Sequence, residues 1–230
     1  MQNTIYVINP NSNPVVTAGI ESAIARLRVA GGPAIACLTL AAGPLGIQTQ
    51  VDVESVVLPL IALTQSLRPS AAAFVLACFS DPGLFAVREA MRNVPGEPVG
   101  LPVLGICESA ALTALTLGTR FGVIAIAQAS IPRHLRTWGA MGVLDRLAGE
   151  DAIGMNVADL ASGDTTLTRM IAAGRRLRDD KGADVLVMGC AGMAQFRDPL
   201  QDALKVPVVE PSQAATAMAL GRVLLNWHGA

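Results

Sequence analysis

Short apolar runs alternate with stretches of helical period along the whole chain. The expected strands are Thr4–Ile8, Ala34–Leu40, Ala72–Ala77, Val103–Ile106, Phe121–Ile126, Asp184–Met188 and Val206–Val209, with a weaker one at Ala152–Val157. Helices are expected between them at about 14–30, 52–67, 83–93, 109–117, 131–147, 165–181, 197–204 and 212–227. Because the strands are apolar on both faces and separated by helices, the pattern predicts an α/β fold with parallel sheets covered on both sides.

The two halves of the chain repeat one pattern. The stretch Ala72–Cys78 matches Ala183–Cys190, since each is an apolar strand that ends in a cysteine and leads into a glycine-containing turn. A second strand follows in each half and opens with Pro-Val, at Pro102 and at Pro207. The repetition predicts two pseudo-symmetric halves, each a roughly four-stranded parallel sheet flanked by helices. Ligands bind beyond the carboxyl ends of such strands, so the active site is expected in the cleft between the halves.

The sequence also suggests where the halves meet. We expect residues 1–97 together with 212–230 to form the first α/β half, and residues 98–211 to form the second. Asn93–Leu101, which contains two prolines and two glycines, is the expected crossing point.

Composition narrows the class of partner. The chain is 52% hydrophobic, but its longest charge-free stretch, Val29–Val51, is rich in glycine and proline and does not predict a membrane helix. The N-terminal segment has no basic region and no long apolar run, so no signal peptide is expected and the predicted location is cytoplasmic. A net charge of -1 argues against nucleic acid and anionic membranes as partners, which leaves a small-molecule substrate.

Neither a metal nor a cofactor is expected. The four cysteines form no C-x-x-C pair, and the chain has only two histidines, so metal-ligand spacing is absent. No G-x-G dinucleotide motif or Walker lysine occurs. His134 and His228 have no Ser or Asp partner nearby in the sequence, which leaves a hydrolytic triad unsupported.

Cys78 and Cys190 are the candidate catalytic residues. A thiol at a strand end, before a helix N-terminus, is expected to have a lowered pKa. Two such thiols on opposite faces of one carbon could remove and return a proton, which is general acid–base catalysis. The alternative is that each cysteine is a small buried hydrophobic residue, but their matched positions favour the catalytic interpretation. Cys107 has no symmetric partner and is expected in the core or near the site, and Cys37 is expected to be a packing residue.

The carbanion formed by proton removal needs hydrogen-bond donors. Backbone N–H groups in the two cysteine turns, and small polar side chains after the first strand, are expected to supply them. These candidate binding residues are Phe79, Ser80, Ala191, Gly192, Asn11 and Ser12. Asn13 is expected to cap the helix that begins at Pro14, and Asp81 is interpreted as a structural cap.

These motifs resemble the Asp/Glu/hydantoin racemase superfamily nearly from end to end. Ile8–Ser12, Ala77–Leu84 and Gly189–Gly192 are most similar to the hydantoin and allantoin racemase branch. The resemblance implies pseudo-symmetric α/β halves, cofactor-independent epimerisation and two catalytic cysteines, which map onto Cys78 and Cys190. It also suggests a homo-oligomer. Gln48 departs from the acidic residue that many hydantoin racemases carry there.

The leading hypothesis is therefore a racemase that acts on C5 of a 5-substituted hydantoin, allantoin included. Three alternatives stay open: an aspartate or glutamate racemase, an arylmalonate decarboxylase-like lyase, and a non-catalytic protein that binds a small molecule. The lyase would need only the second cysteine, and the binding protein would not need two symmetric thiols.

Overall fold

Two four-stranded parallel sheets form the framework of the protein. The computed structural model describes residues 4–92, 100–156, 160 and 163–227. The first sheet has the order β2-β1-β3-β4, with β1 at Thr4–Asn9, β2 at Ala34–Thr39, β3 at Ala71–Leu76 and β4 at Val103–Gly105. The second has the order β6-β5-β7-β8, with β5 at Phe121–Ala125, β6 at Leu147–Ala152, β7 at Val185–Gly189 and β8 at Val208–Val209. The strand order is the same in both sheets, so β1 to β4 correspond to β5 to β8.

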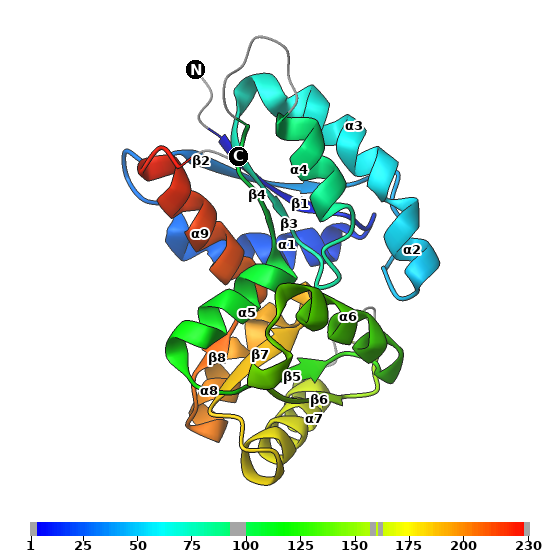
Figure 1. Ribbon diagram of the computed structural model, residues 1–230, viewed down its shortest axis with the longest axis vertical. Helices are drawn as coiled ribbons and strands as arrows, with labels where there is room; N and C mark the ends of the chain where they lie inside the picture. The colour runs from blue at the N-terminus through cyan, green and yellow to red at the C-terminus, as the bar shows by residue number, and fades with distance from the viewer. Residues whose placement is uncertain (1–3, 93–99, 157–159, 161–162, 228–230) are drawn as a thin grey trace. The chain divides into compact units, whose positions relative to one another are not determined.

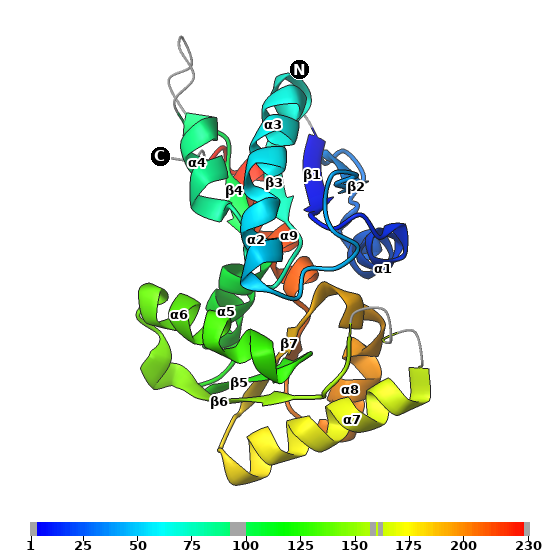
Figure 2. The same cartoon turned by 90° about the vertical axis from the view of Figure 1, so that its right-hand side faces the viewer.

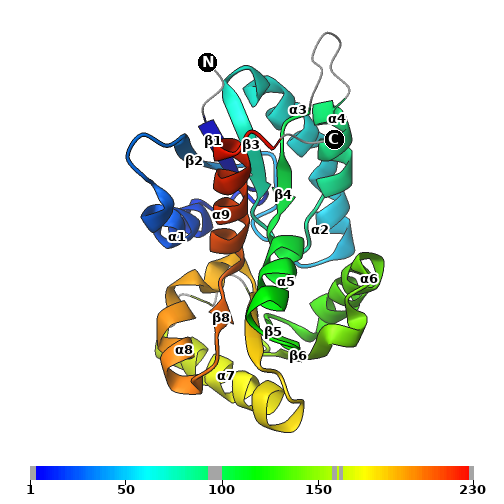
Figure 3. The ribbon, with the colours of Figure 1, turned by 60° about the vertical axis from the view of Figure 1, so that its left-hand side comes forward.

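The chain divides into two compact units, each built on one sheet. Unit 1 comprises Met1–Ile106 and Ser212–Ala230, and unit 2 comprises Cys107–Pro211. Figure 3 shows β4 running directly into the helix α5 and β8 into the helix α9, which are the two places where the chain passes from one unit to the other.

Helices cover both faces of the first sheet (Figures 1 and 2). They are α1 at Pro14–Ile24, α2 at Gln50–Ser55, α3 at Val57–Leu67, α4 at Leu84–Arg92 and α9 at Pro211–Leu224. Phe74 and Leu76 of β3 point to one face and pack with Leu60 of α3 and with Val87 and Met91 of α4. The intervening residues of β3 are also buried, since a strand with helices on both faces is apolar throughout.

The second sheet is covered in the same way. Its helices are α5 at Ile106–Leu117, α6 at Ile131–Met141, α7 at Gly163–Arg175 and α8 at Arg197–Leu204. Figure 2 shows α5 and α6 on one face and α7 and α8 on the other. Leu186 and Met188 of β7 belong to the core cluster that includes Met170 of α7 and Leu200 of α8. The predicted α/β class, with two four-stranded parallel sheets flanked by helices, is confirmed.

One strand lies elsewhere than predicted. The weak strand expected at Ala152–Val157 is found at Leu147–Ala152, and the helix expected to reach residue 147 ends at Met141. Gly142 causes the early end, because its left-handed φ of 70° caps the helix where a residue with a side chain would be strained. Val157 lies outside the described residues.

The first crossing between units also differs from the expectation. The sequence placed it after residue 97, within Asn93–Leu101, of which residues 93–99 lie outside the described part of the chain. The structure places it after Ile106. The reason is that β4 pairs with β3, with Phe74 opposite Val103, so the strand after the loop still belongs to the first sheet.

Within the described residues, every helix is too short or too polar to cross a membrane.

Candidate active site

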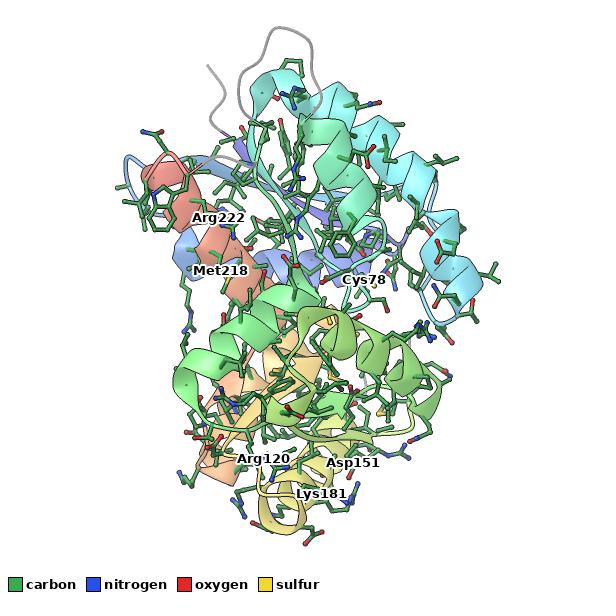
Figure 4. The ribbon with its side chains drawn as sticks, viewed as in Figure 1. Cys78, Arg120, Asp151, Lys181, Met218 and Arg222 are labelled. Atoms are coloured by element: carbon green, nitrogen blue, oxygen red, sulfur yellow. The ribbon has the colours of Figure 1, made fainter. Side chains whose placement is uncertain are left out.

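The two candidate cysteines occupy corresponding places in the two sheets. Cys78 follows the carboxyl end of β3, and Cys190 follows the carboxyl end of β7, which is the corresponding strand of the second sheet. Both side chains are partly buried and both are free thiols. Figure 4 labels Cys78. The structure thus places each thiol at the sheet edge where open α/β proteins bind ligands.

A tight turn holds Cys78. The N–H of Asp81 donates to the carbonyl of Cys78 at 2.9 Å, and the N–H of Leu84 donates to the carbonyl of Asp81 at 3.2 Å. Asp81 has a φ of 43°, which is unusual for a residue with a side chain. The turn leads directly into α4. Phe79 is only 4% exposed and packs inward, whereas Ser80 is partly exposed.

A short 3-10 helix, Ala191–Phe196, follows Cys190. Burial raises the pKa of the Cys190 thiol to about 11, the hydrogen bond from the Gly192 N–H lowers it, and the negative charge of Glu210 raises it. The expectation that a helix N-terminus would lower this pKa is therefore wrong for Cys190. The helix that follows is only six residues long, and its contribution is smaller than the cost of burying a thiolate. Cys190 is a neutral thiol at pH 7.

The backbone donors expected in the two turns differ in their availability. The Gly192 N–H bonds the Cys190 thiol of its own turn rather than pointing to a ligand. No hydrogen bond among the described residues uses the N–H of Ser80 or of Ala191. These two groups, one in each unit, stay available to an anionic oxygen.

Asn9, which sequence analysis did not select, organises the loop after β1. Its side chain is fully buried, and its Nδ2 lies 3.0 Å from Oδ1 of Asn11, 3.0 Å from Oγ1 of Thr17 and 3.1 Å from the carbonyl of Asn13. Its Oδ1 accepts from the N–H of Asn11 at 3.2 Å. A buried asparagine at a strand end has no distinctive sequence signal, because only the folded loop shows how many groups it bonds.

Asn11 and Ser12 lie in the loop that Asn9 holds. Oδ1 of Asn11 accepts from Asn9 and from the N–H of Asn13 at 2.9 Å, so this oxygen has a structural role. No described residue accepts a hydrogen bond from Nδ2 of Asn11 or from the hydroxyl of Ser12, and both can serve a ligand. Asn13 caps α1 as expected, with its Oδ1 accepting from the N–H of Val15 at 3.0 Å.

The comparisons with known proteins give the family. The family model described as Asp/Glu/hydantoin racemase matches residues 5–219. The chain belongs to the Asp/Glu/hydantoin racemase family. A hydantoin racemase of Rhizobium meliloti is 32% identical to this chain over 219 residues, which cover 94% of this chain and 86% of that relative. A hydantoin racemase of Paenarthrobacter aurescens is 30% identical over 228 residues, covering 97% and 92%.

A solved structure of the allantoin racemase from Klebsiella pneumoniae is also similar to this racemase-family chain. It superimposes with a TM-score of 0.87 at 27% sequence identity, and the match covers 99% of this chain and 90% of that one. The predicted resemblance to the hydantoin and allantoin racemase branch is confirmed, and the chain is an isomerase of the racemase class.

The other two cysteines of this racemase-family protein lie outside the turns. Cys107 is fully buried near the start of α5, which agrees with a core position. Cys37 lies in β2, where burial and a hydrogen bond with Glu21 raise the pKa of its thiol to about 12. The Cys37 thiol is therefore a poor acid–base group near neutral pH.

His134 has a structural partner that is distant in sequence. Its Nδ1 lies 2.7 Å from Oε2 of Glu150, whose Oε1 accepts from Nε1 of Trp138 at 2.6 Å. The His134 and Glu150 side chains are 2% and 1% exposed, so this group ties α6 to β6 inside unit 2. Among the described residues, no group of three or more His, Cys, Asp and Glu side chains could hold a metal ion.

Replacing Asn9 with alanine is expected to lower the free energy of unfolding by about 2 kcal/mol, because several buried donors and acceptors lose their partner. Urea unfolding measures the loss, and Ser12→Ala is the matched control because its hydroxyl has no partner among the described residues. An Asn9→Ala loss no larger than that of the control would show that the buried bonds contribute little.

Proposed function

We propose that this protein racemises a 5-substituted hydantoin, allantoin included, by inverting the configuration at C5 with two thiols and no cofactor. The observation that carries the proposal is the pair of free cysteines, Cys78 and Cys190, at corresponding strand ends of two sheets with the same strand order. The hydantoin and allantoin racemases similar to this chain support the substrate class.

The chemistry follows from the acidity of the C5–H bond, which lies beside a ring carbonyl. One cysteine, as thiolate, removes the C5 proton, and the electron pair of the C–H bond moves into the ring as an enolate. The other cysteine, as thiol, delivers its proton to the opposite face of C5 and becomes the thiolate. One proton is taken and one is returned, so the inverted product leaves the two thiols in exchanged protonation states.

The raised pKa of Cys190 supports a division of roles at rest. Since Cys190 is neutral at pH 7, we assign it the acid and Cys78 the base for the first turnover. The N–H groups of Ser80 and Ala191 and the Nδ2 of Asn11 are donors for the enolate and the ring carbonyls.

Local charge favours a neutral ring over an amino acid. The turns Cys78–Asp81 and Cys190–Met193 contain no lysine or arginine, and Asp81 and Glu210 bring carboxylates close to their ends. The carboxylate of aspartate or glutamate would be repelled there, whereas a hydantoin carries no charge to repel. This observation makes the amino-acid racemase the weaker candidate.

Exchange in heavy water tests the proposal. Enantiopure 5-substituted hydantoins, allantoin, L-aspartate and L-glutamate are incubated with the protein in D₂O. NMR follows loss of the C–H signal, and polarimetry follows loss of rotation, each against the spontaneous rate without protein. We expect both losses with hydantoins or allantoin and neither with the amino acids.

The other candidates give different results in the same assay. An amino-acid racemase would exchange aspartate or glutamate, and a lyase would release CO₂ from an arylmalonate. A binding protein would raise the melting temperature with a hydantoin but exchange no proton. The homo-oligomeric state and the cytoplasmic location stay predictions.

A further inference from the structure

The two cysteine turns can be superimposed residue by residue through the strand register. Leu76 of β3 lies opposite Gly105 of β4, and Cys78 comes two residues after Leu76. In the second sheet Val187 lies opposite Val209, so Glu210 follows opposite Met188, and Cys190 comes two residues after Met188. Gly105 and Glu210 therefore occupy corresponding positions at the ends of β4 and β8, one in each unit.

In unit 1 a carboxylate fills the place where a side chain at position 105 would lie. A Cβ added to Gly105 would lie 2.2 Å from Cγ of Asp81 and 2.4 Å from each carboxylate oxygen. Asp81 reaches this place from the cysteine turn and adopts a positive φ of 43° to do so, a conformation that costs about 1 kcal/mol or more for a residue with a side chain.

In unit 2 the carboxylate comes from the strand end instead. Glu210 stands where unit 1 has Gly105, and it is 2% exposed. Its charge acts on the Cys190 thiol. The residue that corresponds to Asp81 is Met193, three residues after the cysteine, which is fully buried in the core. Each unit thus has one carboxylate at this position. In unit 1 it comes from the cysteine turn and the strand ends in a glycine, whereas in unit 2 it comes from the strand end and the turn has a methionine.

We propose that Asp81 and Glu210 are equivalent positioning residues, each of which holds a carboxylate near the catalytic thiol of its own unit and disfavours the thiolate form of that cysteine. The inference rests on the proposed two-thiol function, which it deepens by assigning the groups that influence the protonation state of the two cysteines. Neither residue was selected for this role from the sequence, where Asp81 was interpreted as a structural cap.

Both carboxylates lie close to the start of a helix. Gly105 directly precedes α5, and Glu210 directly precedes α9, helices of 12 and 14 residues. The N-terminus of a helix stabilises a nearby negative charge. The same charge opposes formation of a thiolate close by, because two like charges repel in a poorly solvated site. For Cys190, the Gly192 N–H acts in the opposite direction, and Glu210 is the charged group that acts on it.

The rate of thiol alkylation tests the inference without any substrate. The full-length protein is treated with iodoacetamide across a series of pH values, and the modified peptides are quantified by mass spectrometry for Cys78 and Cys190 separately. In Glu210→Gln we expect the pH midpoint for Cys190 to fall by about one unit, which at a fixed pH below the midpoint is about tenfold faster alkylation. The midpoint for Cys78 should not move.

The equivalent substitution in unit 1 is expected to affect only the thiol of unit 1. In Asp81→Asn the midpoint for Cys78 should fall while that for Cys190 stays unchanged. Glu210→Asp keeps the charge and should keep the midpoint of the native protein. Asp202→Asn, an exposed carboxylate on α8, is the matched control and should move neither thiol.

A variant that moves the carboxylate to another residue shows whether the midpoint depends on the charge or on the local structure of the turn. The double variant Asp81→Ala with Gly105→Glu moves the carboxylate of unit 1 to the strand end, where unit 2 has Glu210, because alanine leaves free the space that the Asp81 carboxylate fills. It should restore the native midpoint of Cys78. If Glu210→Gln and Asp81→Asn each leave both midpoints unchanged, or shift both thiols together, the assignment is overturned.

The outcome is distinguishable from failure of the proposed function. Should the protein racemise no hydantoin, the alkylation midpoints would still report whether each carboxylate acts on its thiol. Should it racemise hydantoins with unshifted midpoints, the two-thiol mechanism would stand and the positioning role would fall. In an active protein the pH–rate profile of racemisation should shift in Glu210→Gln but not in Glu210→Asp.

Discussion

Replacing either Cys78 or Cys190 with serine is expected to lower the rate of racemisation by about 10³-fold in both directions. Positioned acid–base groups contribute about 10²–10⁴-fold to a rate, and a serine hydroxyl is too weak an acid and its alkoxide too scarce to substitute. Inversion needs both proton transfers, so loss of either group stops the reaction. Polarimetry with an enantiopure hydantoin measures the effect in each direction.

A finer signature accompanies this loss. In Cys78→Ser the remaining thiol of Cys190 can still remove a proton from the enantiomer whose hydrogen faces it and return a deuteron to the same face. That enantiomer should exchange in D₂O without inversion, while its mirror image should exchange only very slowly. In Cys190→Ser the two enantiomers should exchange these behaviours, which NMR and polarimetry together distinguish.

Cys37→Ser is the matched control for the two variants. Its thiol lies in β2 and has a pKa raised to about 12, so its replacement should leave turnover within about twofold of the native protein. If Cys78→Ser and Cys190→Ser each retained full turnover as well, the thiols would be packing residues, and a non-catalytic interpretation of both turns would gain.

Strong apolar periodicity made most of the framework predictable from the sequence. β3 and β7 are buried along their whole length, and such strands appear as continuous apolar runs that end where the polar turns begin. The same runs located Cys78 and Cys190 at strand ends. Repetition of a pattern in two halves is visible in sequence alone, and the identical strand order of the two sheets bears it out.

The features that could not be predicted from the sequence depend on contacts between residues that are distant along the chain. β6 has the half-polar sequence Leu147–Ala152 at a sheet edge, so it lacks the run of apolar residues that marks a central strand. The pKa of Cys190 depends on burial and on Glu210, 20 residues further along the chain, which local helix arguments omit. Asn9 was missed for the same reason, since its partners are assembled only when the loop folds.

Disrupting the His134–Glu150–Trp138 group is expected to lower the free energy of unfolding more than the other substitutions considered for stability. Glu150 lies on β6 opposite Val123, and it bonds two side chains of α6. Trp138 in turn packs against Phe121 of β5, with ring centroids 5.5 Å apart and an edge-to-face angle of 78°. The Glu150 carboxylate therefore anchors α6 to β6, and the Trp138 ring packs the same helix against β5.

Glu150→Ala is expected to lower the free energy of unfolding of unit 2 by about 3–5 kcal/mol, since it removes the hydrogen-bond acceptor of two buried side chains, His134 and Trp138, at about 1–3 kcal/mol each. Urea unfolding followed by tryptophan fluorescence measures it. The chain has two tryptophans; Trp138 is fully buried and Trp227 is 64% exposed, so the change on unfolding reports mainly on unit 2. Asp145→Asn, an exposed carboxylate of the same unit, should cost less than about 0.5 kcal/mol.

A double variant shows whether the loss comes from stranded polar groups or from lost volume. His134→Leu with Glu150→Met replaces the hydrogen-bonded pair with apolar side chains, so only the Trp138 N–H loses an acceptor. Since well-packed apolar replacements of buried pairs are often nearly neutral, the double variant should be more stable than Glu150→Ala by about 1–3 kcal/mol. Equal losses would instead mean that leaving His134 without Glu150 costs little, and that the loss comes from the bond between Glu150 and Trp138.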